Sequence, residues 1–328
     1  MSEFNRRAFL YSASAASLAG VALGNWSRAA AAADEAHKNA TNTRRKFTLC
    51  LSCGMLGVRA EPRETIDLAA QFGFESVEPP VGLLMSLSDA ELAEMLAALK
   101  AKHLAWGATG LSVNFRGDDA AFQADLAKLP AAAAGLQRAG ITRVATWLSP
   151  SHRSLTYVAN FRLHATRLRE VAKVLGDHGL RLGLEYVGTK SLWTSSQFPF
   201  IHTMAEMKDL IAEIGQDSVG FLLDSWHWFN ARETEADLLS LGNRDVVLCH
   251  LNDAPAGVPL DQQQDGTREL PCATGVIDVK TYLGALVKIG YDGPVAAEPF
   301  YKPLGTMPRD AALRATADAM RKAVALVQ

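Results

Sequence analysis

Apolar runs of strand length alternate with amphipathic segments throughout residues 46–328. The amphipathic segments repeat their apolar positions with the spacing of helices, whereas the short apolar runs are typical of buried strands. Eight runs predict strands, at residues 47–52, 75–78, 104–108, 143–147, 181–185, 220–224, 246–250 and 294–298. Because parallel strands need a long crossover connection, usually a helix, this alternation predicts a parallel sheet.

Local signals mark where the helices should begin and end. Ser88 with Glu91, and Thr203 with Glu206, have the spacing of a capping box, in which a side chain and the backbone exchange hydrogen bonds at a helix start. Pro62 is expected in the first turn of another helix. Glycines that should close helices lie before the following strands, at Gly140, Gly179, Gly215 and Gly290.

The count and order of these units predict the fold class. Eight strand–helix units in roughly 280 residues match an α/β protein of the (β/α)8 TIM-barrel type. A doubly wound open sheet is the alternative, but it usually has fewer strands and a glycine-rich phosphate loop after the first. The segment from Gly54 to Gly57 does not have that pattern. We therefore expect a TIM barrel over residues 46–328.

Residues 1–33 differ from the rest of the chain. Arg6 and Arg7 precede Phe9 and Leu10, a mildly apolar stretch follows, and small residues fill positions 29–33. This order is typical of a twin-arginine export signal and predicts a periplasmic protein, with residues 34–45 as a linker. The apolar stretch is short and rich in Ser and Gly, so no stable membrane span is expected. A disordered alanine-rich tail is the alternative.

Charge and cysteine content narrow the classes of partner. The formal net charge is −2, and acidic and basic residues are interleaved, whereas a nucleic-acid-binding protein usually carries a basic face. Cys50 and Cys53 form a C-x-x-C motif, but no second pair completes a zinc site, and the motif lies at a strand instead of opening a helix. We interpret them as packing residues, with disulfide pairing left open. The sequence does not decide the oligomeric state, and a homo-oligomer is one option.

The ends of the last four predicted strands carry the candidate chemistry. They are Glu185, Asp224, His250 and Glu298. In a parallel barrel these ends meet at one rim, where active sites of this fold lie. Any one of these residues could be a helix cap, an ion-pair partner or a structural histidine. The same position in successive units favours one shared site.

Three converging carboxylates point to a metal ion. Charged side chains are rarely buried unless they are paired or metal-bound, and acids gathered without a cation repel one another. Oxygen-rich coordination with one imidazole suits Mn²⁺ best, with Mg²⁺, Co²⁺ and Zn²⁺ also open. Cys249 should face away from this site, because neighbouring strand residues point to opposite sides.

The segments around these residues resemble the xylose-isomerase-like TIM-barrel superfamily of sugar isomerases and epimerases. The similar segments are LEYVG at Glu185, LLDSWH at Asp224, HLNDAPAG from His250 and GYDGPVAAEPF at Glu298. The resemblance implies that these four residues bind one divalent metal ion. It also implies that Glu185 and Glu298 form the acid/base pair and that His227 helps to hold substrate oxygens.

Two departures concern the substrate. Endonuclease IV shares this barrel but uses three zinc ions with additional histidines, whereas the second to fourth strands here end near Glu78, Ala108 and Trp147, which argues against DNA repair. Many epimerases of this superfamily carry an arginine shortly after the seventh-strand histidine. Here that place is Ala256-Gly257, and Arg268 is the nearest substitute.

The resemblance implies a divalent-metal-dependent sugar isomerase or epimerase that transfers a proton through an enediolate, on a ketose, aldose or related sugar. The same groups could instead perform β-elimination on 3-keto glycosides, which export would bring within reach. A third reading is a non-catalytic protein that binds a metal ion and a sugar. The small-molecule partner in each case is a carbohydrate.

Further residues are candidates for contact with the substrate. Glu78 follows the second strand, Arg268 lies in the long connection at residues 252–277, and Trp147 and Trp226 could offer faces on which a sugar stacks. Trp106 and Trp228 are weaker candidates for that role. The long connection is expected to form a lid or a substrate wall, and Asp253 is expected to orient His250 or to line the pocket.

Overall fold

The computed structural model describes residues 45–328, so the predicted export signal at residues 1–33 and residues 34–44 of the linker lie outside the described part. All eight predicted strands are confirmed. The strands of the main sheet are β1 (Thr48–Leu51), β2 (Ser76–Val77), β3 (Ala105–Trp106), β4 (Thr109–Gly110), β5 (Arg143–Trp147), β7 (Arg181–Glu185), β9 (Val219–Asp224), β10 (Val246–Leu251) and β11 (Pro294–Ala297).

The sheet closes on itself as a parallel barrel. Its order is β3-β2-β1-β11-β10-β9-β7-β5-β4, and every neighbouring pair is parallel. The first and last members, β3 and β4, are two parts of one interrupted strand, separated only by Gly107 and Ala108. A Cβ atom at Gly107 would lie 2.5 Å from Cys50 Sγ, so glycine permits the close approach of these strands. The predicted TIM-barrel architecture is therefore observed.

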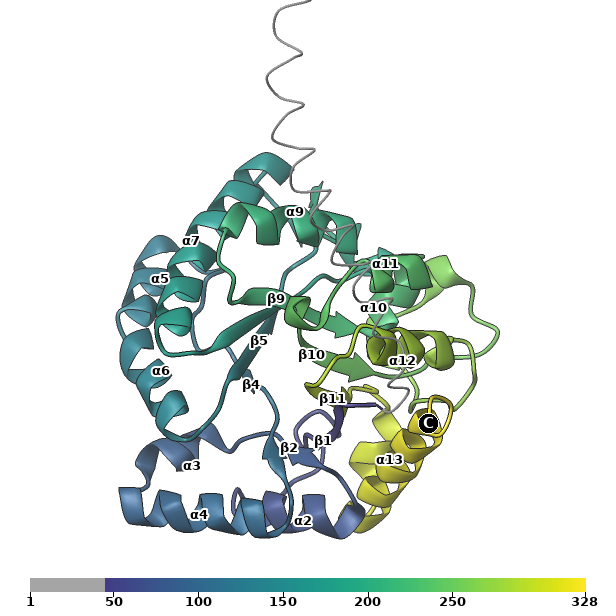
Figure 1. Ribbon diagram of the computed structural model, residues 1–328. Helices are drawn as coiled ribbons and strands as arrows, with labels where there is room; N and C mark the ends of the chain where they lie inside the picture. Colours follow the sequence, from purple (N-terminus) through teal and green to yellow (C-terminus); the bar gives the residue numbers. More distant parts are fainter. Residues whose placement is uncertain (1–44) are drawn as a thin grey trace, which may run out of the picture. The chain divides into compact units, whose positions relative to one another are not determined.

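Helices surround the barrel (Figure 1). The longer ones are α2 (Glu64–Phe72), α4 (Asp89–Ala101), α5 (Asp119–Leu126), α6 (Leu129–Arg138), α7 (Tyr157–Asp177), α9 (Met204–Ile214), α12 (Val279–Lys288) and α13 (Arg309–Val324). Shorter elements lie near the strand ends: α3 (Val81–Ser86), α8 (Lys190–Trp193), α10 (Ser225–Asn230), α11 (Glu235–Leu239), and the 3-10 turns η1 (Asn243–Asp245), η2 (Leu260–Gln262), η3 (Asp265–Thr267) and η4 (Lys302–Thr306). A separate antiparallel pair joins β6 (Ser151–His152) to β8 (Phe198–Pro199).

The helix signals in the sequence were largely confirmed. Both capping boxes form, at Ser88 for α4 and at Thr203 for α9. The glycines expected after helices have left-handed φ angles, of 73° at Gly140, 70° at Gly179, 67° at Gly215 and 71° at Gly290. The prediction for Pro62 was wrong, because α2 begins at Glu64 and Pro62 lies in the turn before it.

Two apolar regions stabilise the barrel. The larger one packs the helices against the outside of the sheet, and a smaller one fills the barrel interior with Ala108, Ala145, Leu222 and Leu248. Strand residues two positions apart point to the same side. Asp224 therefore follows Leu222 into the barrel mouth, as His250 follows Leu248. This apolar interior layer lies directly beneath the polar residues at the mouth of the barrel.

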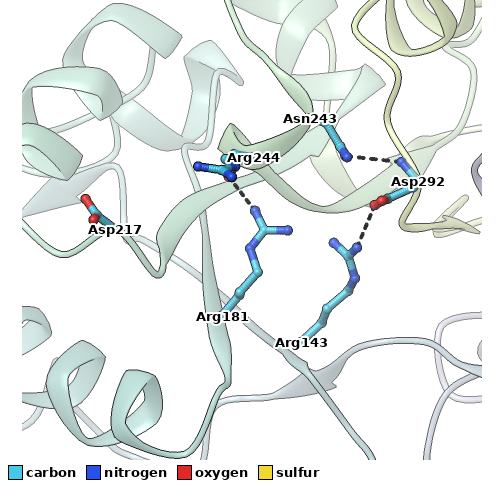
Figure 2. A pocket seen from close by; sticks show the side chains of 6 residues that line it. All are labelled: Arg143, Arg181, Asp217, Asn243, Arg244 and Asp292. Atoms are coloured by element: carbon cyan, nitrogen blue, oxygen red, sulfur yellow. Dashed lines mark hydrogen bonds and ion pairs between the residues drawn. The ribbon is translucent and has the colours of Figure 1, made fainter.

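Arginine side chains close the opposite end of the barrel. Arg143 and Arg181 are the first residues of β5 and β7. Arg143 pairs with Asp292 at 2.9 Å (Figure 2). It also donates to the carbonyl oxygen of Val247 at 2.9 Å. The cavity between them, of about 340 Å³, is lined by Arg143, Arg181, Asp217, Asn243, Arg244 and Asp292. It lies at the amino ends of the strands, away from the predicted site, and the guanidinium groups within it serve the scaffold.

Two further expectations concern the scaffold. Cys50, Cys53, Cys249 and Cys272 are all free thiols. Burial raises the pKa of the Cys50 thiol to about 12 and that of Cys53 to about 11, and the nearby Glu78 carboxylate adds to both shifts. Such thiols are poor nucleophiles, which agrees with a packing role. Among residues 45–328, no helix is long and apolar enough to cross a membrane.

His164 is a buried titratable group in the helical layer. It lies on α7 and is 4% exposed, with its ring centroid 5.6 Å from that of Phe115 and 4.9 Å from that of Phe200. Its Nδ1 atom lies 2.9 Å from the carbonyl oxygen of Asn160. Burial lowers the pKa of His164 to about 4, and the neighbouring positive charge of Arg116 adds to the shift. The neutral imidazole is therefore favoured in the folded protein.

This burial predicts a loss of stability in weak acid. The unfolded chain takes up the proton near pH 6.5, so the contribution of His164 is complete above that pH and is lost as the pH falls toward 4. Relative to H164F, the wild-type protein should lose about 2 kcal/mol of unfolding free energy between about pH 7.5 and about pH 5. Urea denaturation across this range measures the difference. H103N, at an exposed histidine, is the control and should keep the wild-type pH dependence, whereas parallel curves for wild type and H164F would contradict the prediction.

Candidate metal centre

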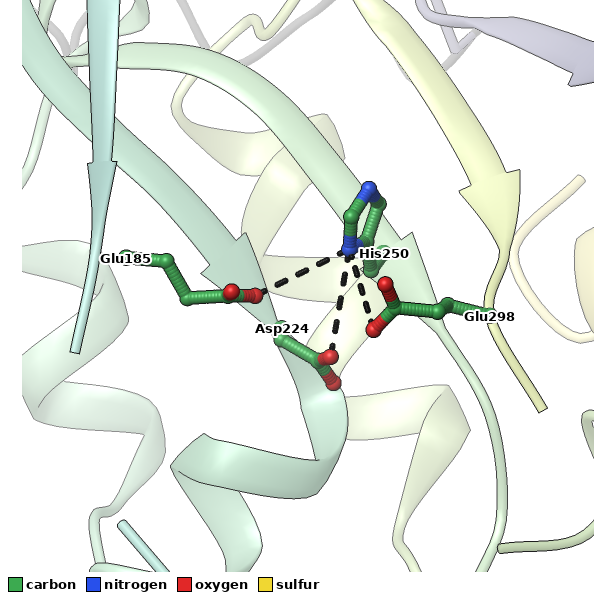
Figure 3. A group of neighbouring side chains, drawn as sticks. All are labelled: Glu185, Asp224, His250 and Glu298. Atoms are coloured by element: carbon green, nitrogen blue, oxygen red, sulfur yellow. Dashed lines mark ion pairs between the residues drawn. The ribbon is translucent and has the colours of Figure 1, made fainter. Parts of the chain in front are cut away.

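Four side chains converge at the carboxyl ends of four adjacent strands (Figure 3). Glu185 ends β7, Asp224 ends β9, His250 lies near the end of β10, and Glu298 follows β11 directly. One ligand atom from each lies within 4.8 Å of all the others. Glu185, Asp224 and His250 are buried, and Glu298 is partly buried. The structure thus brings together all four predicted ligands.

The unsatisfied atoms in this cluster fit a cation. His250 Nδ1 lies 3.3 Å from Glu298 Oε2, 3.7 Å from Glu185 Oε1 and 4.0 Å from Asp224 Oδ2. Glu185 Oε1 and His250 Nδ1 are both buried, and neither has a hydrogen-bond partner within the described chain. A buried polar atom without a partner is costly. A metal ion between these atoms would satisfy both.

The charge balance supports the same conclusion. Burial, reinforced by the neighbouring Glu298 carboxylate, raises the pKa of Glu185 to about 7 even though His250 opposes the shift. Burial would lower the pKa of His250, but Glu298 and Glu185 raise it well above its usual range. To bind a metal ion, His250 must be neutral. The three carboxylates would then carry three negative charges, of which Arg268 offsets at most one, and one divalent cation would neutralise the remaining two.

Arg268 reaches the cluster from the long connection at residues 252–277. Its Nη1 atom donates to Asp224 Oδ2 and to Glu298 Oε2, both at 2.7 Å, and Nη2 donates to Asp265 at 2.8 Å. The side chain is only 2% exposed, and its guanidinium lies 4.4 Å from the ring centroid of Phe300. Sequence reasoning placed Arg268 at the substrate. The structure places it as a fixed positive charge against two of the predicted ligands, Asp224 and Glu298.

The orientation of Asp224 is set by its neighbours. Its Oδ1 atom accepts from the backbone N–H of Trp226 at 2.6 Å, which caps α10, and from Asn252 Nδ2 at 2.8 Å. Burial alone would raise the pKa of Asp224, but the Arg268 guanidinium, with help from His227, holds it well below its usual range. Oδ2 is the oxygen that faces the other predicted ligands, and it also accepts the hydrogen bond from Arg268.

Sequence reasoning missed Asn252. The residue is fully buried, and besides donating to Asp224 it accepts from Ser225 Oγ at 2.9 Å. It therefore ties the start of α10 to the end of β10. Its place two residues after His250, on the same side of the strand, was a signal that could have revealed it.

His227 lies beside the cluster on α10 and is 2% exposed. Its Nε2 atom is 3.4 Å from Arg268 Nη2, and its Nδ1 atom has no partner in the described residues. Burial lowers the pKa of His227, and the Arg268 charge acts in the same direction although Asp224 opposes it. A neutral imidazole at this place can hydrogen-bond to a substrate oxygen. This is compatible with the predicted role of His227 in substrate binding, which stays a prediction.

The tryptophans occupy different environments. Trp147 is 50% exposed at the end of β5, where it can contact a substrate. Trp226 is fully buried, and its indole N–H donates to Thr189 Oγ1 at 2.7 Å. The expected stacking face on Trp226 is therefore wrong, because the ring packs in the core below Arg268. Trp106 and Trp228 likewise use their indole N–H groups on backbone carbonyls, of Ala139 and Thr234.

Two acidic candidates lie outside the ligand cluster. Glu78 accepts a hydrogen bond from Ser52 Oγ at 2.5 Å, and its contact with a substrate stays a prediction. Asp253 does not orient His250. It is fully buried and accepts from the backbone N–H groups of Thr274, Gly275 and Ile277 at 2.7–2.9 Å, so it organises the long connection instead.

Comparison with known proteins agrees with this geometry. The model of the xylose isomerase-like TIM barrel family matches residues 66–323, and the chain belongs to that family. A solved xylose isomerase domain protein from Alicyclobacillus acidocaldarius is 31% identical, with 86% of this chain and 99% of that one covered and a TM-score of 0.73. The IolI protein, solved with a bound zinc atom, shares the fold with a TM-score of 0.71 at 18% identity, over 86% of this chain and 99% of its own.

Curated relatives are matched over shorter segments. Inosose isomerase from Bacillus velezensis is 26% identical over 133 residues, which are 40% of this chain and 44% of that protein. The 3-dehydroshikimate dehydratase from Pseudomonas aeruginosa is 27% identical over 140 residues, which are 42% of this chain and 20% of that protein. The match thus spans less than half the length of these relatives.

The cluster predicts that divalent cations stabilise the folded protein. A cation that binds only the folded state at a hundredfold excess over its Kd should add about 2.7 kcal/mol of stability. Thermal unfolding with Mn²⁺ and with EDTA measures the effect. H250Q should lose most of it, whereas C249A, on the same strand but facing Tyr282 and Tyr291 instead of the ligands, should retain it. Equal cation stabilisation of wild type and H250Q would show that the ion binds elsewhere.

Proposed function

We propose that this protein is a divalent-metal-dependent sugar isomerase or epimerase. The observation that carries the proposal is the closed set of four ligands, Glu185, Asp224, His250 and Glu298, in a family whose matched relatives include inosose isomerases. These residues would hold the cation, for which the oxygen-rich donor set favours Mn²⁺, with Zn²⁺, Mg²⁺ and Co²⁺ as alternatives. When bound, such a cation polarises a substrate carbonyl and acidifies the neighbouring C–H bond.

The residues of the chain would move the proton. Glu185 and Glu298 approach the cluster from opposite sides, on β7 and after β11, with β9 and β10 between them (Figure 3). One carboxylate would remove a proton from the carbon next to the carbonyl, and the same or the opposite one would return it. Return to the neighbouring carbon gives isomerisation, and return to the other face of the same carbon gives epimerisation.

Two further groups would act on the substrate. Arg268 holds a permanent positive charge beside Asp224 and Glu298, where it would stabilise negative charge that develops on substrate oxygen. His227, neutral and buried, would hold a hydroxyl group of the sugar. The predicted export signal at residues 1–33 leads us to propose a periplasmic location.

A lyase is the second candidate, favoured by the matched dehydratase segment and by the predicted export. In this reaction the same carboxylate removes the proton next to the carbonyl of a 3-keto glycoside. The C–H electron pair forms a C=C bond, and the C–O bond to the aglycone breaks with the oxygen leaving as an alcohol after protonation. Both reactions begin with the same proton transfer, so the site geometry supports either.

Substitution of Glu298 tests the proton-transfer role. E298Q keeps one oxygen for the cation but cannot accept a proton, so kcat should fall roughly a hundredfold to ten-thousandfold. Initial rates give kcat, and the thermal shift with Mn²⁺ should remain largely intact. E213Q, at an exposed glutamate, serves as the control and should be fully active. Near-normal turnover by E298Q would remove Glu298 from the mechanism.

A substrate panel in D₂O separates the two reactions. The Mn²⁺-loaded enzyme is incubated with free ketoses and with 3-keto glycosides, and products are followed by NMR and mass spectrometry. An isomerase or epimerase should place one solvent deuterium on carbon without releasing an aglycone. Aglycone release from the keto glycosides, with no exchange in free ketoses, would identify the lyase instead.

A further inference from the structure

Arg116 lies between two aromatic rings at the mouth of the barrel. It follows β4 in the chain, and its guanidinium carbon is 4.4 Å from the ring centroid of Phe115 and 4.4 Å from that of Trp147. Phe115 is fully buried, whereas Trp147 is half exposed. The two rings hold the guanidinium plane and leave its N–H edge available.

That edge is poorly satisfied by the protein. Arg116 Nη2 donates to Thr146 Oγ1 at 3.0 Å, and the buried Nε atom has no partner in the part of the chain that the structure describes. Within the same residues, no carboxylate forms an ion pair with Arg116, and burial lowers the pKa of this guanidinium to about 10. Arg45, Arg143, Arg167 and Arg268 are each paired with an acid, and Arg181, which has no such pair among the described residues, donates to the backbone carbonyls of Arg244 and Val246 instead.

A second guanidinium lies near that of Arg116. Arg116 and Arg167 both lie close enough to His164 to disfavour its protonation. Arg167 is engaged by the carbonyls of Phe115 and Gly117 and by Asp119. Arg116 is partly buried and lacks a counterion among the described residues, so a ligand that supplies the missing negative charge would bind here favourably.

This corner is next to the proposed catalytic site. Trp147 is the register neighbour of Glu185 across β5 and β7, and the N–H of Leu148 donates to the carbonyl oxygen of Glu185 at 2.9 Å. Trp147 also lies two residues beyond Ala145 of the interior layer, so it points into the barrel mouth. One wall of the mouth therefore carries the ligand carboxylates, and the wall beside Trp147 carries Arg116.

We propose that Arg116 binds an anionic oxygen group, carboxylate or phosphate, of the substrate. The carbonyl end of the sugar would lie at the cation site formed by the four predicted ligands, and the anionic group would lie at the far end of the sugar against the guanidinium edge. The substrate class is then an acidic sugar derivative, a sugar acid or a sugar phosphate, and not a neutral sugar. This inference rests on the proposed function, since it assumes that a keto sugar occupies the mouth.

Three 2-ketoses that differ only at carbon 6 test this assignment: D-fructose, D-fructose 6-phosphate and D-fructuronate. Isothermal titration of the full-length, Mn²⁺-loaded protein measures binding without requiring turnover. Because charge-assisted hydrogen bonds strengthen binding, at least one anionic ketose should bind roughly tenfold to a hundredfold more tightly than D-fructose. A preference for the phosphate or for the carboxylate identifies which group the site takes.

Matched variants assign the preference to Arg116. R116M keeps an unbranched apolar stem but no charge, so it should lose the preference while its affinity for D-fructose stays within about twofold. R153M, at an exposed arginine on the same side of the barrel, should behave as wild type. If R116M does not fold, R116K, which keeps the charge but not the planar fork, should reduce the preference several-fold.

The contrary outcomes are distinct. Equal binding of all three ketoses, no binding of either anionic ketose, or a uniform loss of affinity in R116M would overturn the anion site, and the last would leave Arg116 as a support for Trp147. Solvent deuterium uptake tests the proposed function separately. Exchange in D-fructose without an anion preference rejects this inference alone, whereas an anion preference without exchange in any ketose rejects the isomerase function alone.

Discussion

Repulsion between three carboxylates, two of them buried and one partly buried, is the constraint on which the rest of this structure depends. Glu185, Asp224 and Glu298 point into one barrel mouth because they end strands of a closed parallel sheet, above an apolar floor. In that environment their negative charges are poorly screened. Arg268 contacts two of the carboxylates and offsets one charge, His250 lies beside Glu298 as a candidate metal-binding nitrogen, and a divalent cation would offset the other two charges. The barrel thus gathers an excess of negative charge that favours binding of a divalent cation, and the proposed reaction needs such a cation.

The long connection at residues 252–277 supplies residues that contact the charged cluster, in addition to covering the barrel mouth. Asp253 binds three backbone N–H groups across the connection, which fixes its course, and Arg268 then reaches the ligands with only 2% of its side chain exposed. Asn252 acts at the other end of the same segment, where it orients Asp224. The position of Arg268 and the orientation of Asp224 are therefore coupled through one segment of the chain.

The two walls of the mouth differ in sign. The ligand carboxylates occupy β7 to β11, whereas Arg116 and Trp147 lie on the side of β4 and β5, without an acidic partner for Arg116 in the described residues. A molecule with a metal-binding carbonyl at one end and an anion at the other would match both walls. The opposite charges of the two walls concern the class of substrate that would bind. They do not distinguish the lyase from the isomerase, because both reactions need the same proton transfer.

The sequence by itself determined the eight strands, the capping boxes and the four polar residues that converge at the barrel mouth. Each depends on local information: a period of two along a strand, a three-residue capping interval, or a polar residue at a strand end. Only the tertiary structure decided that Trp226 is buried, that Asp253 organises the connection, and that Arg268 contacts two of the four predicted ligands. These contacts depend on the course of the irregular connection at residues 252–277 and on which residues, distant in the sequence, pack against it. Backbone hydrogen bonds and packing across many elements set these contacts, and no local periodicity records them.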